Sequence, residues 1–310
     1  MKVVGVETFG GPEALAVHEI PEPHAGEGTV RIRVQAFAVN PTDTGVRAGQ
    51  RDSSEALPPY VPGMDAAGVI DEVGDGVEGW QVGDQVMAMA LPLSEHGGAY
   101  VEHLVAPVGS FTRIPAGLSI EEAATVPMNG LTALQILARA GLSEGDTLAV
   151  TGAAGLLGNY VVQLAKQRGI TVVADAAPKD EDLVRSLGPD HMVRRGDGFA
   201  AAVRGIVPDG VDALADAAVQ RDEVVDAVRD GGFFADVRGW EGNGARGIRF
   251  ERIMVFSEYT SFDLLEELRQ AVEDGILVPR VAEVLPAERA SEAHERLEAG
   301  GTRGRFVLTW

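Results

Sequence analysis

Three glycines spaced three residues apart, Gly152, Gly155 and Gly158, are the residues whose types and spacing best indicate chemistry. A short apolar run, 148–150, precedes them, and a helical pattern of apolar residues follows as far as Ala165. A strand, a glycine turn and a helix N-terminus can together hold a dinucleotide pyrophosphate, because free backbone amides meet its negative charge. Such turns also join strands to helices for structural reasons alone, so the surrounding sequence must decide.

Strands and helices alternate around this turn. Ser119 is expected to cap a helix that begins at Ile120, with acidic residues in its first turn. The strands expected after it are 147–151, 171–175, 191–194, 211–217, 232–237 and 252–257. About six strands in such an alternation predict an α/β fold with a doubly wound parallel sheet.

The first hundred residues have a different pattern, typical of a compact β-rich domain. Short strands with glycine and proline punctuation are expected at 29–39, 69–73, 85–89 and 99–105. A helix over 262–272, another over 287–297 and a closing strand at 305–310 are better placed on this domain than on the parallel sheet. We therefore expect one domain from 1–117 and 262–310, a second from 118–261, and an active site in the cleft between them.

Composition narrows the classes of function. The chain has no cysteine, which excludes disulfides, thiolate zinc sites and cysteine nucleophiles. Its formal net charge of −21 argues against nucleic acid and anionic membranes as partners. No apolar run approaches the roughly 18 residues that span a bilayer, and the N-terminus lacks a signal-peptide pattern, so a cytoplasmic protein is expected.

Several motifs occur in the order typical of one family. They are Val39-Asn-Pro-Thr-Asp43, Pro62-Gly-Met-Asp-Ala-Ala-Gly-Val69, Gly83-Asp-Gln-Val86, Gly97-Gly-Ala-Tyr-Val-Glu102, Asn129-Gly-Leu-Thr-Ala133, Ser186-Leu-Gly-Pro-Asp-His191 and Gly301-Thr-Arg-Gly-Arg-Phe-Val-Leu308. With the glycine turn, they make the chain resemble the zinc-independent quinone oxidoreductase branch of the medium-chain dehydrogenase/reductase superfamily. The resemblance implies a GroES-like substrate domain, a Rossmann domain, a homodimer, and hydride transfer from NADPH to a quinone or activated double bond.

The same resemblance implies roles for individual residues. Asn40 would lie beside the nicotinamide and substrate, and Thr132 would contact the nicotinamide. The pyrophosphate would be surrounded by Gly152, Ala153, Ala154, Gly155, Leu156, Leu157 and Gly158. Structural alternatives stay open, since Asn40 before a proline can fix a turn and Thr132 can be a packing residue.

One expected substrate contact is missing. Many quinone oxidoreductases carry a tyrosine shortly after the Asn-Pro-x-Asp element, and the matching residue here is Gly45. Tyr60, Arg47 and Arg51 are near in sequence and can substitute for it, although any of them can also be a surface residue. Tyr60 is the candidate catalytic residue that we carry forward.

Zinc is not expected. Relatives with a catalytic zinc need a thiolate and an imidazole at the sites that match 40–43 and 63–65, and neither site holds Cys or His here. Without a Lewis acid, alcohol oxidation is hard, because nothing strong stabilises the alkoxide. Reduction of a quinone or conjugated enone remains feasible, because modest hydrogen bonds can hold the developing enolate.

The nucleotide preference depends on two opposed signals. Asp175 ends the strand after the glycine turn and can accept hydrogen bonds from both ribose hydroxyls, which favours NAD(H). Lys179, Arg194 and Arg195 can bind a 2′-phosphate, which favours NADP(H). The resemblance also favours NADP(H), while Asp175 keeps NAD(H) open.

The leading hypothesis is therefore a zinc-free reductase of small-molecule quinones or α,β-unsaturated carbonyls. The alternative is a cofactor-binding protein without redox turnover, which the loss of a tyrosine at Gly45 supports. A zinc-free alcohol dehydrogenase fits less well. The glycine-rich segment 239–247 is expected to form either a lid over the cofactor or a disordered surface loop.

Overall fold

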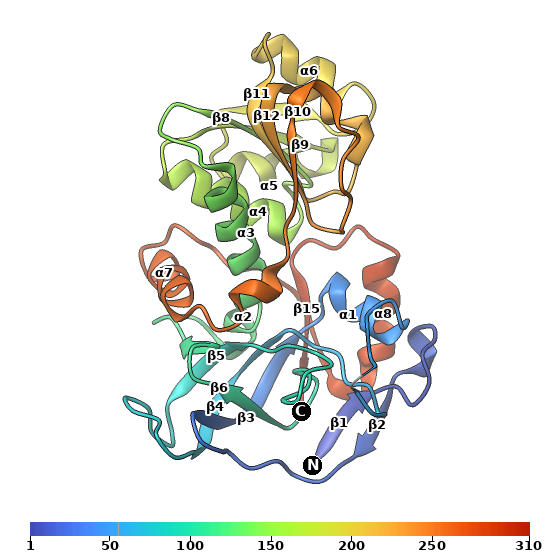
Figure 1. Ribbon diagram of the computed structural model, residues 1–310, viewed down its shortest axis with the longest axis vertical. Helices are drawn as coiled ribbons and strands as arrows, with labels where there is room; N and C mark the ends of the chain where they lie inside the picture. Colours follow the sequence, from blue (N-terminus) through green and yellow to red (C-terminus); the bar gives the residue numbers. More distant parts are fainter. Residues whose placement is uncertain (55) are drawn as a thin grey trace. The chain divides into compact units, whose positions relative to one another are not determined.

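The computed structural model describes residues 1–54 and 56–310 of the chain. It divides into two compact units, shown in Figure 1. The first unit comprises Met1–Met128, Phe256–Gly275 and Pro279–Trp310, and the second comprises Asn129–Val255 and Ile276–Val278. The second unit thus begins at 129 rather than at 118, because helix α2 (Ile120–Ala123) packs on strands of the first unit.

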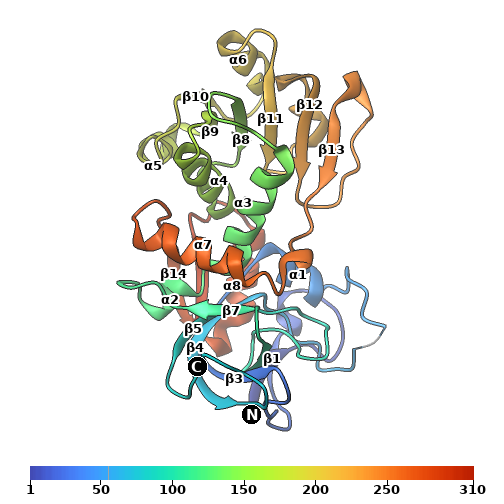
Figure 2. The ribbon, with the colours of Figure 1, turned by 60° about the vertical axis from the view of Figure 1, so that its left-hand side comes forward.

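The second unit contains a six-stranded sheet in which every pair is parallel. The strands lie in the order β10 (His191–Arg194), β9 (Thr171–Ala176), β8 (Thr147–Thr151), β11 (Val211–Asp216), β12 (Val228–Asp236) and β13 (Arg249–Arg252). Figure 2 shows β13 at one edge of this sheet. The order runs outward in both directions from β8, which confirms the predicted doubly wound parallel sheet.

The predicted strand at 252–257 is wrong. Its place in the sheet is taken by β13, which pairs with β12 from Phe233↔Arg249 onward, and a 3-10 helix, η6 (Val255–Glu258), follows. The apolar residues that suggested a strand, Ile253 and Val255, are buried but lie outside β13, although Ile253 N still donates to Asp236 O of β12 at 2.8 Å. A short apolar run therefore signalled burial here and not strand geometry.

Helices connect the parallel strands, and a buried apolar cluster packs beside the sheet. Helix α3 (Pro127–Ala140) precedes β8, and α4 (Leu156–Gln167), α5 (Glu181–Ser186) and α6 (Phe199–Ile206) each connect two successive strands. The cluster includes Phe199 and Val203 of α6 together with Leu214 and Phe234 of the sheet. The apolar face of α6 thus explains how this helix is held against its own sheet.

Segment 239–247 is anchored to the same unit. The ring of Trp240 meets Phe234 edge-on at 5.3 Å between centroids, and the backbone N–H of Trp240 donates to Asp236 Oδ1 at 2.7 Å. Arg246 donates to the backbone carbonyls of Val225 and Val228 at 2.8 and 2.7 Å. These contacts do not support a disordered surface loop, and they leave the lid interpretation a prediction.

The first unit is built on a seven-stranded sheet. Its path is β14 (Val281–Pro286), β15 (Arg305–Thr309), β3 (Thr29–Ala38), β4 (Asp65–Val73), β5 (Gln85–Met89) and β7 (Phe111–Arg113), and β6 (His103–Pro107) also pairs with β3. A two-stranded sheet joins β1 (Lys2–Gly5) to β2 (Ala16–Glu19). This is the β-rich domain that the sequence predicts.

Buried and less buried side chains alternate along β3, as expected of a strand with one face on the core. Val30, Ile32 and Val34 are buried, whereas Arg31 and Arg33 between them are not. The chain's last strand, β15, pairs antiparallel with β3 through Val307↔Ala38, although more than two hundred residues separate the strands.

Two helices from the C-terminal part, α7 (Phe262–Glu273) and α8 (Ala290–Glu298), belong to this unit too. In the part of the chain that the structure describes, no helix has both the length and the apolar character needed to cross a membrane.

Candidate nucleotide and substrate sites

The glycine turn follows β8 directly and leaves little room for a side chain at Gly152 or Gly158. Gly152 has φ +69°, and a Cβ there would lie 3.1 Å from backbone atoms of Ala217 and Ala218. A Cβ on Gly158 would lie 2.4 Å from the Gly152 carbonyl oxygen. Gly155 is the N-cap of α4, whose first intrahelical bond runs from Asn159 N to Gly155 O at 2.9 Å. The amides of residues 156–158 precede that bond and are available to an anion.

Asp175 supports this turn from the neighbouring strand. Its Oδ1 accepts a hydrogen bond from Ala153 N at 2.9 Å, and its side chain is only 2% exposed. Burial raises the pKa of this carboxyl, and Arg195 Nε lies 3.8 Å from Oδ2. The carboxylate therefore acts first as an anchor of the turn and exposes little surface to a ribose.

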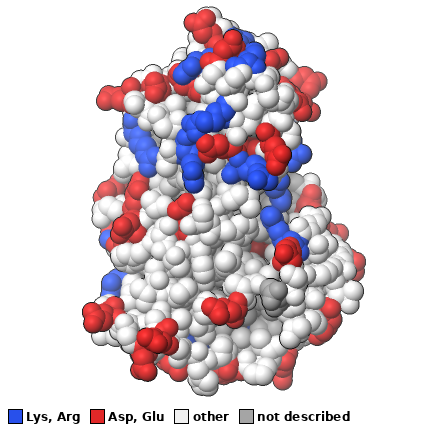
Figure 3. Space-filling model, viewed as in Figure 1, with Lys and Arg blue, Asp and Glu red and all other residues white. Residues whose placement is uncertain are grey.

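Basic residues lie beyond Asp175. Strands β10 and β9 are paired with Val193 opposite Asp175. Arg194 and Arg195 therefore lie at the carboxyl ends of these strands. Lys179 is in the 3-10 helix η2 (Pro178–Asp180), and it is exposed, as are Arg194 and Arg195. Figure 3 shows Lys and Arg side chains gathered over the second unit on the face that it draws. The structure thus brings the glycine turn, Asp175 and Arg195 together at one edge of the sheet.

Two further aspartates at this edge were missed from the sequence. Asp216 ends β11 and accepts from Thr151 Oγ1 at 2.6 Å and from Arg221 N at 2.7 Å. Asp236 ends β12 and accepts from Arg238 N at 2.8 Å. An Ala-Asp pair occurs at or near the end of β9, β11 and β12, and this repeated dipeptide is the signal that identifies these loop anchors.

Asn40 is held rigidly in the first unit. It is the N-cap of α1 (Pro41–Arg47) and is fully buried. Its Nδ2 donates to Asp65 Oδ2 at 2.6 Å, and its Oδ1 accepts from Arg305 Nε at 2.9 Å. Because a donor faces the oxygen and an acceptor faces the nitrogen, the amide has one satisfied orientation. A contact of Asn40 with nicotinamide or substrate stays a prediction.

A second set of buried polar groups adjoins it. Asp43 accepts from Asn40 N at 2.7 Å, from Gly63 N at 3.1 Å and from Tyr100 Oη at 3.2 Å. Tyr100 Oη also lies 3.0 Å from His294 Nε2. Burial raises the pKa of Asp43 to about 7 and that of Asp65 to about 7, and it lowers the pKa of His294 to about 3. His294 is therefore neutral near neutral pH.

The remaining candidates lie in different surroundings. Tyr60 stacks on Phe9 with 4.4 Å between centroids, so its catalytic role stays a prediction. Arg47 is buried and forms an ion pair with Glu298 at 2.7 Å, which makes it a structural residue. Thr132 lies within α3, in the second unit, and is 7% exposed.

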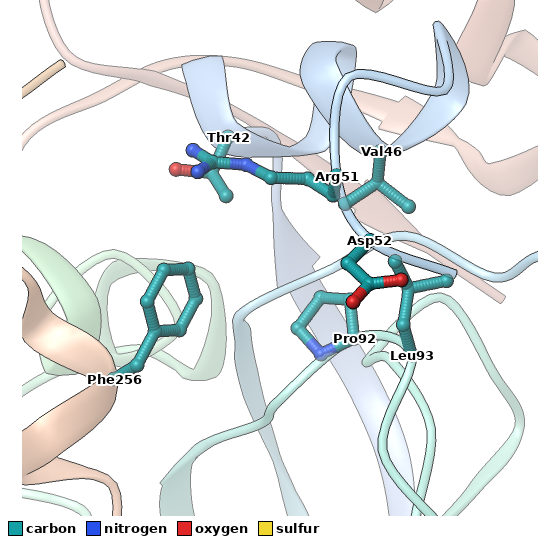
Figure 4. A pocket seen from close by; sticks show the side chains of 7 residues that line it. All are labelled: Thr42, Val46, Arg51, Asp52, Pro92, Leu93 and Phe256. Atoms are coloured by element: carbon teal, nitrogen blue, oxygen red, sulfur yellow. The ribbon is translucent and has the colours of Figure 1, made fainter. Parts of the chain in front are cut away.

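The first unit also contains a cavity of about 180 Å³. Its lining residues are Thr42, Val46, Arg51, Asp52, Pro92, Leu93 and Phe256, shown in Figure 4. Neither Tyr60 nor Arg47 is among them, whereas Arg51 is. Across residues 1–54 and 56–310, no group of three or more His, Asp or Glu side chains is arranged to hold a metal ion.

Comparison with known proteins agrees with this architecture. The family model for the alcohol dehydrogenase GroES-like domain matches residues 26–134, and that for zinc-binding dehydrogenase matches 187–308. A 2-haloacrylate reductase from Burkholderia sp is 30% identical, over 96% of this chain and 96% of the relative. The chain belongs to the medium-chain dehydrogenase/reductase superfamily. This superfamily member is an oxidoreductase, and it has no cysteine with which to form a thiolate zinc site.

Other relatives of this medium-chain dehydrogenase/reductase are similar over most of the chain. The chloroplastic NADPH-dependent alkenal/one oxidoreductase of Arabidopsis thaliana is 30% identical, over 99% of this chain and 79% of the relative. A solved NAD-dependent alcohol dehydrogenase is 31% identical with a TM-score of 0.89, covering 100% of both chains. The quinone oxidoreductase from Coxiella burnetii is 26% identical with a TM-score of 0.87, covering 100% of this chain and 99% of the other.

Proposed function

We propose that this chain is an NADPH-dependent reductase of carbon–carbon double bonds conjugated to a carbonyl, including those of quinones. The glycine turn carries the proposal. It leaves the amides of 156–158 available to an anion, and its backbone packs too closely at Gly152 and Gly158 for a larger residue. These features fit a dinucleotide pyrophosphate. The named activities of the haloacrylate and alkenal/one reductases support the same reaction class.

The chain's own residues position the reactants. The glycine turn, supported by Asp175, binds the pyrophosphate of the cofactor. Thr132 of α3 is the residue that we propose to contact its nicotinamide ring. Asn40, locked by Asp65 and Arg305, is the residue that we propose beside nicotinamide and substrate. A bound reduced nicotinamide supplies the hydride, so that with one proton from solvent the double bond becomes a single bond.

Support for NADPH over NADH comes from the charges around β9 and β10. Asp175 is buried and paired with the turn, so it opposes a 2′-phosphate less than an exposed carboxylate would. Arg195, Arg194 and Lys179 supply exposed positive charge at the same edge. The alkenal/one oxidoreductase is named as NADPH-dependent, whereas the solved alcohol dehydrogenase is named as NAD-dependent.

The direct test measures oxidation of NADPH and NADH by absorbance with a panel of quinones, enals and enones. Turnover with at least one acceptor, faster with NADPH, is the expected result. Tight NADPH binding without turnover on any acceptor would instead establish the alternative, a cofactor-binding protein. The homodimer implied by family resemblance is also proposed, and light scattering of the purified chain tests it.

Removing the two arginines should weaken NADPH selectively. In the Arg194→Ala, Arg195→Ala double variant, we expect KM for NADPH to rise about 10- to 100-fold, because charge-assisted hydrogen bonds to the 2′-phosphate are lost. KM for NADH should change little, since NADH has no such phosphate. The control is Arg185→Ala, which removes an exposed arginine paired with Asp182 on α5. Equal effects on both nucleotides would count against a 2′-phosphate site.

A further inference from the structure

The cavity in the first unit has apolar walls and two separated charges. Val46, Pro92, Leu93 and Phe256 supply apolar surface, and Thr42, Arg51 and Asp52 supply polar groups. A cavity of about 150 Å³ holds one benzene, so the 180 Å³ here suits a single ring or a short chain. Given the proposed function, on which this inference rests, the cavity is a place where the chain can select its acceptor.

Arg51 is the cation among the residues that line the cavity. Among the described residues no Asp or Glu forms an ion pair with it, and its guanidinium carbon lies 5.7 Å from the centre of the Phe256 ring. Figure 4 shows the guanidinium beside Thr42, with Phe256 on the other side of the space. An arginine held over an aromatic ring keeps its donors free for an anion.

Gly45 explains why Arg51 can lie there. A Cβ built on Gly45 would be 3.9 Å from Arg51 Nε and 3.6 Å from Gln50 Oε1. A tyrosine at this position, which many quinone oxidoreductases carry, would therefore extend into the space that Arg51 uses. This part of the chain therefore offers a charged donor, Arg51, where a tyrosine at position 45 would offer a neutral one.

Asp52 limits the number of anionic groups that the cavity accepts. It lies with Pro92 and Leu93, apart from the guanidinium, and no ion pair joins it to Arg51. A hydrogen bond from Ser54 N to Oδ1, 3.0 Å long, holds the pKa of Asp52 below its ordinary value, so it is ionised. A second anionic group on the ligand would be repelled there.

We propose that the preferred substrate is a small enone carrying one carboxylate, and that Arg51 binds this carboxylate and determines specificity. The carboxylate is distinct from the activating group, because an ionised carboxylate is a poor acceptor of the negative charge that hydride addition creates. A separate ketone or aldehyde conjugated to the double bond accepts this charge better than the carboxylate does. A 4-oxo-2-enoate has this arrangement within about eight heavy atoms, a size that the cavity suits.

The test compares 4-oxopent-2-enoate with its methyl ester, using NADPH and the full-length chain. Wild-type protein should show a higher kcat/KM for the acid. In Arg51→Met the acid-to-ester ratio of kcat/KM should fall about 10- to 100-fold, mainly through KM for the acid, because a charge-assisted bond is lost. Arg51→Lys should restore part of the ratio, since it keeps the charge but not the fork of donors.

Arg113→Met is the matched control. Arg113 also lies over an aromatic ring, Trp80 at 4.6 Å, but it does not line the cavity, so the ratio should not move. Equal losses for acid and ester in Arg51→Met would overturn the proposal, because Arg51 would then serve the carbonyl or the fold. Turnover of neutral enones without preference for the acid would overturn it as well and leave the proposed function standing. No NADPH oxidation with any acceptor would defeat the proposed function itself.

Discussion

Gly158→Ala is expected to weaken NADPH binding about 100-fold, since displacement of positioning groups by about 1 Å has effects of this size. The new Cβ would lie 2.4 Å from the Gly152 carbonyl oxygen and 2.9 Å from Ala153 Cα. These are backbone atoms, so the turn itself must move. Movement at Ala153 would stretch its 2.9 Å hydrogen bond to Asp175 and displace the amides that meet the pyrophosphate. Titration calorimetry with NADPH measures the loss.

Two other glycines give graded controls for this variant. A Cβ on Gly155 meets only the Gly152 oxygen, at 3.2 Å and with ordinary φ, so Gly155→Ala should bind NADPH more tightly than Gly158→Ala. Gly205 in α6 faces open space, and Gly205→Ala should leave binding unchanged and stabilise the unit by up to about 1 kcal/mol. If Gly158→Ala bound NADPH within about threefold of the unchanged chain, a difference below 1 kcal/mol, the turn would not be the nucleotide site.

Local patterns predicted most of the strands of the second unit. The strands at 147–151 and 191–194 begin and end at the predicted residues, because turn residues bound each of them. Ser119 caps α2 as expected, with its Oγ accepting from Glu122 N at 3.2 Å. The doubly wound parallel sheet followed from the alternation of strands and helices, which leaves few topologies for such a sheet.

The substrate side could not be predicted in the same way, because its contacts join distant parts of the chain. Arg305 orients Asn40 across 265 residues, and His294 reaches Tyr100 across 194. Neither pairing leaves a local periodicity in the sequence. Nearness in sequence likewise gave no reason to prefer Arg51 over Tyr60, since only the path of the chain after α1 decides which of them lines the cavity.

Stability should fall as pH rises from about 5 to about 8, by on the order of 2 kcal/mol for each buried carboxyl involved. Burial raises the pKa of Asp43 and Asp65 from 3.8 to about 7 in the folded chain. Between these values the folded chain retains protons that the unfolded chain has released, so the stabilisation is present at low pH and is lost as pH passes about 7. Urea unfolding at several pH values measures the slope.

Asp65→Asn should reduce this slope and also lower the free energy of unfolding by about 1–3 kcal/mol. Asp65 receives a donor at each oxygen, from Asn40 Nδ2 at 2.6 Å and from Met128 N at 2.7 Å. An amide has one oxygen, so in either orientation its NH₂ group faces a donor. Rotating Asn40 does not relieve the conflict, because its NH₂ group would then face the Arg305 donor.

Tryptophan fluorescence in a Trp240→Phe background reports on the first unit, because Trp80 and Trp310 are then the remaining tryptophans and both lie in it. Asp75→Asn, an exposed aspartate of the same unit, should leave both the slope and the free energy of unfolding unchanged. An unaltered slope in Asp65→Asn would mean that Asp65 is ionised throughout this pH range. The donors from Asn40 and Met128, with the charge of Arg305, would then outweigh burial, and the pH dependence of stability would come from Asp43 alone.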